Sequence, residues 1–174
     1  MQARKIANNR PHVRRAVALG WLVGAYLLPS FANAATCSLN VSPLNFGVYD
    51  ALSMAPADSS TDILVSCTRT VTSGAETVAY TLAVSSGAGN FSARNMLRGT
   101  AVLVYNLHTG ASRSAANVWG DGTGGSSTVT GSLLPLDAAN PTRTANHALY
   151  GRIPARQDVA VGAYNANVVV TVTF

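Results

Sequence analysis

Two histidines and two aspartates are the residues of this sequence whose types could support hydrolysis. His108 or His147 could act as a general base, Asp121 or Asp137 could orient that base, and one of several serines could be the nucleophile. No serine lies in a GxSxG turn or in another setting that would activate it, and serines are common in the turns of β proteins. We therefore expect no catalytic residue and no enzymatic activity.

The glycine-rich stretch GDGTGG, residues 120–125, has the composition of a phosphate-binding or calcium-binding loop. It lacks the Lys-Ser/Thr pair of a P-loop and the oxygen ligands of an EF-hand. The pattern therefore favours a tight turn beside Trp119, and we expect neither a metal ion nor a cofactor.

Two arginines lie close in sequence to aromatic residues: Arg113 precedes Trp119, and Arg152 follows Tyr150. Such a pair could stack on a sugar or bind a carboxylate. In the alternative that we favour, the arginine stem covers an aromatic ring and the guanidinium group bonds to a turn.

Residues 1–34 have the pattern of a secretory signal peptide. Five basic residues and no acid precede an apolar run at residues 16–31, and the small residues Ala32–Ala34 precede the expected cleavage site. A membrane anchor is disfavoured, because this run contains two glycines and a proline and is shorter than the roughly 20 residues that span a bilayer. We predict export, with residues 35–174 as the mature domain and no membrane span in it.

Removing the signal changes the charge of the protein. The signal contains five of the 12 basic residues and none of the 7 acidic residues, so equal numbers of each remain. A neutral domain is a poor candidate for binding nucleic acid or anionic lipid. The only lysine, Lys5, is also in the signal, which excludes Schiff-base chemistry from the mature domain.

Cys37 and Cys67 are the only cysteines, and both belong to the predicted mature domain. In an oxidising compartment they can pair in one way, which would stabilise the fold by about 3 to 4 kcal/mol. The alternatives are two free thiols or half of a metal site, but the CxxC spacing and a nearby histidine are missing. Ile63, Val65 and Cys67 share one face of a predicted strand, which would direct this cysteine inward.

Short apolar runs separated by Gly, Ser, Asn and Pro recur through the mature domain about every ten residues, which is typical of an all-β fold. No window of about 11 residues shows the period of an amphipathic helix, so a two-sheet sandwich is the simplest architecture. The predicted strands are Cys37–Val41, Leu44–Tyr49, Asp62–Thr68, Thr77–Val84, Ala101–Leu107, Ser127–Leu134, His147–Ile153 and Asn165–Phe174.

The last predicted strand is apolar up to its final residue. Val168, Val170, Val172 and Phe174 share one face, and Val169 and two threonines share the other. A strand this apolar must pair inside a sheet rather than fray.

Five segments, in order, resemble the spore coat protein U domain family, which includes subunits of archaic chaperone–usher pili. The segments are LNFGVYD (residues 44–50), ILVSCT (63–68), LVYNLHTGASRSAANVWGDGTGG (103–125), YGRIPARQ (150–157) and VGAYNANVVVTVTF (161–174).

The resemblance implies an incomplete immunoglobulin-like β-sandwich that is completed by a donor strand from a partner. In such families a periplasmic chaperone lends this strand, an outer-membrane usher takes over the subunit, and a neighbouring subunit supplies the strand in the pilus. Val168, Val170, Val172 and Phe174 would then form the wall of the donor-strand groove. The protein would be a structural subunit at the cell surface, with a possible part in adhesion and biofilm formation.

One feature departs from the polymerising subunits of the family, which carry a donor segment before the first cysteine. Only Ala35 and Thr36 separate the predicted cleavage site from Cys37. Either the chain accepts a strand without donating one, as a tip or minor subunit would, or cleavage occurs earlier, after Ala25. Earlier cleavage would free a segment that contains Pro29 and alternates weakly, so we favour the acceptor-only interpretation.

The alternative hypothesis is a complete secreted β-sandwich that binds a ligand such as a carbohydrate. It predicts a stable monomer, whereas the pilus hypothesis predicts a fold that depends on a strand from a partner.

Overall fold

The computed structural model describes residues 35–70 and 74–174, so the predicted signal peptide at residues 1–34 lies outside the described residues. The described chain consists of strands and one short 3-10 helix, η1 (Ala115–Asn117). No helix in these two ranges is long and apolar enough to cross a membrane. The strands are β1 (Ala35–Val41), β2 (Ala57–Arg69), β3 (Glu76–Val84), β4 (Arg94–Arg98), β5 (Ala101–His108), β6 (Val129–Leu136), β7 (Thr142–Ile153) and β8 (Val170–Thr173).

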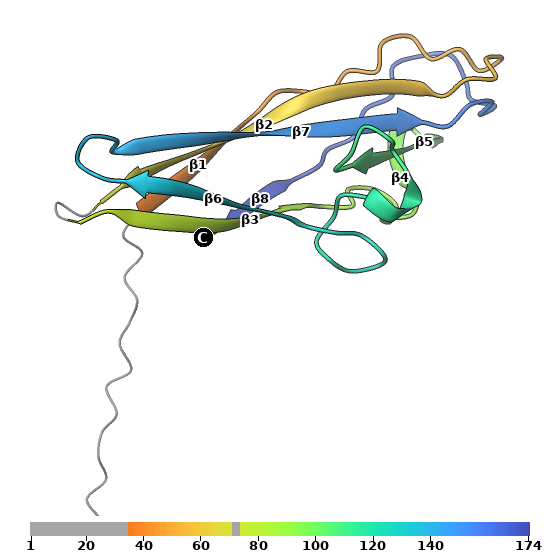
Figure 1. Ribbon diagram of the computed structural model, residues 1–174. Helices are drawn as coiled ribbons and strands as arrows, with labels where there is room; N and C mark the ends of the chain where they lie inside the picture. Colours follow the sequence, from red (N-terminus) through yellow and green to blue (C-terminus); the bar gives the residue numbers. More distant parts are fainter. Residues whose placement is uncertain (1–34, 71–73) are drawn as a thin grey trace, which may run out of the picture. The chain divides into compact units, whose positions relative to one another are not determined.

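The strands form two antiparallel sheets. One sheet has five strands in the order β1-β2-β7-β5-β4, and the other has three in the order β6-β3-β8. Figure 1 shows β3, β6 and β8 lying across from β1, β2 and β7. A single cluster of buried side chains lies between the sheets, with Trp119, Leu82 and Leu136 at most 1% exposed. The predicted two-sheet sandwich is therefore confirmed.

Strand alternation explains which side chains fill this core. In β3, Tyr80, Leu82 and Val84 are buried, and in β2 Ile63 and Val65 have no exposed surface. Burying each apolar side chain of this size contributes about 1.5 to 3 kcal/mol, so the two strands fix the inner face of each sheet.

The prediction of a strand at Leu44–Tyr49 is wrong, because these residues form part of a loop between β1 and β2. Asn45 Oδ1 accepts a hydrogen bond from Gly47 N–H at 2.8 Å, and Gly47 has a φ of +71°. Leu44, Phe46 and Tyr49 of this loop still pack against the core, whereas Val48 is 96% exposed, so part of the apolar pattern reflects packing without a strand ladder. Side-chain hydroxyls of β2 bond to the loop carbonyls, as in the 2.6 Å bond from Ser59 Oγ to Asn45 O.

β4 was not predicted from the sequence, and it pairs with β5 across a two-residue turn. Gly99 in this turn has a φ of +58°, a conformation that glycine adopts without strain. The strand escapes the apolar pattern because Arg94 and Arg98 lie at its two ends.

The predicted last strand, Asn165–Phe174, is shorter as a regular strand because it changes partners. Asn165 pairs with Leu97 of β4, in the five-stranded sheet, whereas Val169 and the residues after it lie beside β3 in the other sheet. The chain therefore crosses from one sheet to the other before β8 begins at Val170.

Candidate functional site

β8 lies at the edge of its sheet, with β3 as its only partner among the described strands. Ser85 N–H donates to Val169 O at 2.9 Å, and Val169 N–H donates to Ser85 Oγ at 2.9 Å. Backbone groups of successive residues point to opposite sides of a strand. The N–H and C=O groups of Val170 and Val172 therefore point away from β3, toward the open edge.

The side chains of the same segment alternate between core and solvent. Val168, Val170 and Val172 are half-buried and pack against the core, whereas Val169 is 65% exposed. Phe174, which we predicted on the inner face, is 39% exposed at the end of the chain. The segment therefore combines an unpaired backbone edge with inward apolar side chains.

A half-open cavity of about 480 Å³ lies beside this segment. The loop after β1 lines it on one side and the chain leading into β8 lines it on the other, with side chains of β3, β4, β5 and β7 between them. We call this cavity the apolar groove. Its lining includes Val41, Pro43, Leu44, Phe46, Val84, Met96, Tyr105, Leu107, Leu149, Tyr164, Ala166, Val168 and Val170.

The position of the groove follows from the sheet order. β1 ends the five-stranded sheet and β8 ends the three-stranded sheet, and no backbone pairing joins these two strands among the described residues. A sandwich with two unpaired edges on the same side leaves part of its core uncovered there. Phe46 lies on this side and meets Tyr105 edge-on, with ring centroids 6.1 Å apart.

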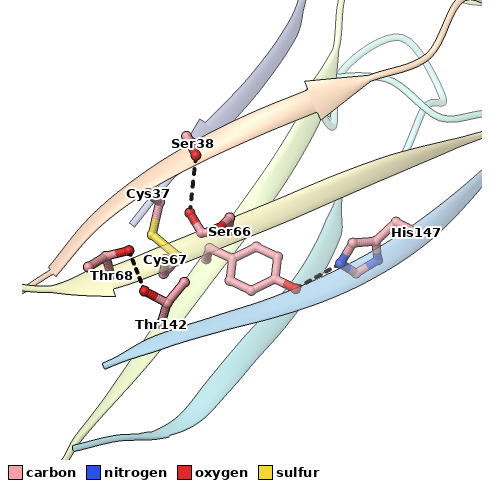
Figure 2. Close-up of a disulfide and its surroundings, with 8 residues drawn as sticks. Cys37, Ser38, Ser66, Cys67, Thr68, Thr142 and His147 are labelled. Carbon is pink, nitrogen blue, oxygen red and sulfur yellow. Dashed lines mark hydrogen bonds between the residues drawn. A yellow bond between two sulfur atoms is a disulfide. The ribbon is translucent and has the colours of Figure 1, made fainter. Parts of the chain in front are cut away.

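The disulfide predicted from the sequence is confirmed. Cys37 in β1 and Cys67 in β2 are directly opposite in the strand register and are bonded, with Cα atoms 4.0 Å apart (Figure 2). The bond holds edge strand β1 to the sheet. It therefore fixes the position of β1, and the loop that follows β1 lines one side of the apolar groove.

The residues considered for hydrolysis make separate local contacts. The ring of His147 bonds to Tyr80 Oη at 2.7 Å, whereas His108 Nδ1 lies 3.1 Å from Ser114 O. Among the described residues, neither histidine bonds to Asp121 or Asp137.

The two aspartates each close a turn. Asp121 Oδ1 accepts bonds from the backbone and hydroxyl of Thr123, which lower the pKa of Asp121. Asp137 Oδ1 accepts from Asn140 N–H at 2.7 Å, which lowers the pKa of Asp137. The Gly-rich stretch GDGTGG thus forms the turn that the sequence predicted.

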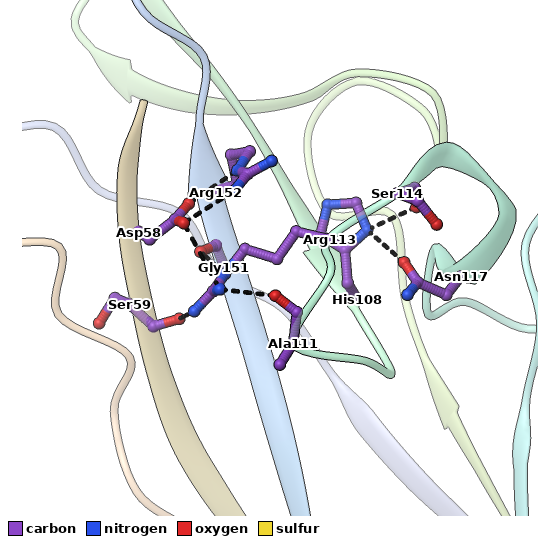
Figure 3. A network of polar contacts seen from close by, with 9 residues as sticks. All are labelled: Asp58, Ser59, His108, Ala111, Arg113, Ser114, Asn117, Gly151 and Arg152. Carbon is purple, nitrogen blue, oxygen red and sulfur yellow. Dashed lines mark hydrogen bonds and ion pairs between the residues drawn. The ribbon is translucent and has the colours of Figure 1, made fainter. Parts of the chain in front are cut away.

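The two singled-out arginines meet at Asp58 (Figure 3). Arg152 donates two bonds to the Asp58 carboxylate, at 2.7 and 2.8 Å, and these bonds lower the pKa of Asp58. Arg113 lies 3.4 Å from the same carboxylate, and its guanidinium group is 5.3 Å from the ring centre of Tyr150. Arg113 thus covers an aromatic ring and bonds to nearby backbone, as we predicted, but its ring is Tyr150 rather than Trp119.

Two sets of residues at these sites were not predicted from the sequence. Arg94 has no exposed surface, and its Nη2 donates to Trp119 O and Ser85 O. A lone arginine in a short polar strand gave no signal of burial. Tyr164 and Ala166 line the groove, and extending the alternation backward from Val168 would have found them.

Comparison with known proteins identifies the family. The Spore Coat Protein U domain matches residues 25–171. No curated protein matches the chain. A similar solved structure is the CsuC–CsuE chaperone–tip adhesion subunit pre-assembly complex from archaic chaperone–usher Csu pili of Acinetobacter baumannii, with 23% identity and a TM-score of 0.51. The alignment covers 80% of this chain and 40% of that chain, and it shows a shared fold. By its match over most of its length, the chain belongs to the Spore Coat Protein U domain family.

Proposed function

We propose that the chain is a subunit of an archaic chaperone–usher pilus and that its apolar groove receives a strand from a partner. The observation that carries this proposal is the coincidence of the open β8 edge with the groove. Family membership and the fold shared with a chaperone–subunit complex support it.

The geometry suits strand addition. An incoming strand would bond to the outward backbone groups of Val170 and Val172, while its alternate side chains would enter the groove. Filling about four apolar sites at about 1.5 to 3 kcal/mol each would contribute about 6 to 12 kcal/mol. This equals much of the stability of an ordinary domain, about 5 to 15 kcal/mol, so folding depends on the donor.

The partners follow from this mode of folding. A periplasmic chaperone supplies the first strand, an outer-membrane usher receives the complex, and a neighbouring subunit supplies the final strand. The chain is exported through the periplasm to the cell surface, where it serves a structural and not an enzymatic role.

The position of β1 favours a tip or minor subunit. β1 begins at Ala35, directly after the predicted cleavage site, and Cys37 is already tied to β2. Cleavage after Ala34 leaves no residues before β1 that could act as a donor strand. In this role the subunit accepts a strand and does not pass one on.

A fused strand tests the proposal. The full chain is extended after Phe174 by a short Gly-Ser turn and a strand that alternates valine and threonine, and the matched control has aspartate in place of each valine. We expect the valine fusion to be a monomer that melts cooperatively, and the control and the unextended chain to aggregate unless a chaperone is co-produced. A monomeric, cooperatively melting unextended chain that gains nothing from the fusion would contradict the proposal.

A further inference from the structure

A second cavity, of about 410 Å³, lies apart from the apolar groove and shares no lining residue with it. His108 and Arg152 line it together with Phe91, Asn106, Gly124 and Gly125. We call it the polar pocket. Its volume falls within the range of about 300 to 1,000 Å³ of small-molecule sites.

His108 provides a hydrogen-bond acceptor in this pocket. His108 is 5% exposed, and its Nδ1 lies 3.1 Å from Ser114 O and 3.2 Å from Asn117 Oδ1. Burial lowers the pKa of His108, so the ring is neutral at pH 7 and Nδ1 carries the proton. Nε2 is left as an acceptor without a partner among the described residues, on the side of the ring turned away from Ser114 and Asn117 (Figure 3).

The arginines give the pocket a positive charge. Arg152 uses Nε and Nη2 to bind Asp58, and its Nη1 makes no hydrogen bond in the described part of the chain. Arg113 shares the same carboxylate at 3.4 Å, so two guanidinium groups face one acid. This local excess stands out because basic and acidic residues are equal in number over residues 35–174.

One wall of the pocket includes an aromatic ring, which has the guanidinium group of Arg94 5.2 Å from its centre. Phe91 lines it, and a Cβ added at Gly124 would lie 3.4 Å from Cδ2 of the Phe91 ring. Gly124 has a φ of +56° and brings bare backbone beside the ring. Pro154 adds a second rigid apolar surface to the lining.

We propose that the polar pocket binds an acidic sugar unit, whose carboxylate bonds to Arg152, whose hydroxyl donates to His108 Nε2 and whose C–H face packs on Phe91. A simple anion leaves the lone pair of Nε2 to solvent, whereas a sugar hydroxyl donates to it directly. A neutral sugar leaves the free Nη1 donor and the positive charge uncompensated. This inference does not rest on the proposed pilus function.

The first experiment measures affinity for D-galacturonate, D-galactose and acetate by calorimetry. The protein is the exported full chain, purified with a co-produced chaperone if it does not fold alone, and the chaperone is titrated separately as a blank. We expect saturable binding of galacturonate, at least about tenfold weaker binding of galactose, and no saturation by acetate in the same range. Equal affinity for galacturonate and galactose, saturation by acetate, or no binding of galacturonate at millimolar concentration would overturn the proposal.

Two pairs of variants locate the binding site. Arg152→Gln should weaken galacturonate at least tenfold, whereas Arg98→Gln, an exposed arginine outside the pocket, should not. Arg152→Gln also removes a partner of Asp58. A second pair of variants therefore leaves the polar contacts of Arg152 and Asp58 intact. Ala115→Trp should block the pocket, whereas the neighbouring exposed Ala116→Trp should bind like the wild type. Unchanged affinity in a folded Ala115→Trp protein would place the sugar elsewhere and overturn the inference.

Discussion

Tyr80 and His147 join the two sheets through a hydrogen bond of 2.7 Å between the phenol oxygen and Nε2. Tyr80 belongs to β3 and His147 to β7, and their rings meet edge-on with centroids 5.7 Å apart. Burial lowers the pKa of His147 and raises that of Tyr80, so the pair is neutral near pH 7. Which of the two groups donates depends on the tautomer of His147, and neither tautomer carries a charge.

This pair predicts that stability falls as the pH is lowered from 7.5 to 5. The unfolded His147 titrates near its ordinary pKa of 6.5, whereas the folded ring has a lower pKa and resists protonation. The unfolded state then binds more protons than the folded state. The stability that the neutral His147 contributes is therefore fully present above pH 6.5 and is lost as the pH falls toward the folded pKa. Burial lowers the pKa of His108 in the same direction.

Urea unfolding of the wild type and His147→Gln over this pH range measures the effect. The variant retains His108, so we expect its pH dependence to be shallower than that of the wild type but not flat. The acid-side loss caused by Asp58 begins only below its ordinary pKa of 3.8 and stays outside the range. Identical slopes for the two proteins would show that the His147 site is not responsible.

Arg94→Met should destabilise the protein by about 3 kcal/mol. Arg94 has no exposed surface, and the variant would leave the carbonyl groups of Ser85 and Trp119 without a donor. Each unsatisfied buried group costs about 1 to 3 kcal/mol. Arg98→Met, on the exposed end of the same strand, is the matched control and should change the free energy of unfolding by less than about 0.5 kcal/mol. Similar urea midpoints for the two variants would show that burial of Arg94 is unimportant.

The sequence predicted the parts of the fold in which one strand face is continuously buried. The alternation of Tyr80, Leu82 and Val84 and the inward position of Cys67 are both confirmed, since a period of two residues allows only one register against a core. The same logic failed at Leu44–Tyr49. Leu44, Phe46 and Tyr49 are partly buried by packing, while hydroxyl groups of β2 satisfy part of the loop backbone. Apolar spacing does not distinguish such a packed loop from a strand.

The candidate sites depend on contacts between residues far apart in the sequence. The apolar groove needs Phe46, Tyr105 and Val168 together, and only sheet order brings them there. The polar pocket depends on Asp58 lying opposite Arg152 in the β2–β7 register. Local pattern singled out Arg113 and Arg152 but gave no indication of Asp58, because its carboxylate is 94 residues from its closest partner.

Removing the disulfide should cost about 3 to 4 kcal/mol of stability. Cys37 and Cys67 are separated by 30 residues, and opening this loop returns entropy to the unfolded chain. Urea unfolding of the valine fusion, in which the added strand completes the fold, measures the loss when it is done with and without reductant. The double variant Cys37→Ala/Cys67→Ala should be as weak as the reduced protein and insensitive to reductant. If the oxidised and reduced proteins unfold at the same urea concentration, β1 is held by its backbone pairing alone.

Two neighbouring valines test the groove directly. Val170 is half-buried at the groove, whereas the side chain of Val169 points outward and is 65% exposed. Val170→Asp would place a carboxylate where the donor strand's apolar side chains must pack, and burying an unpaired polar group costs at least about 2 kcal/mol. We expect at least about a tenfold loss of chaperone-bound subunit recovered from the periplasm for Val170→Asp and little loss for Val169→Asp. Because both variants add the same charge at adjacent positions, equal recovery of the two would mean that the donor strand does not occupy this side of β8.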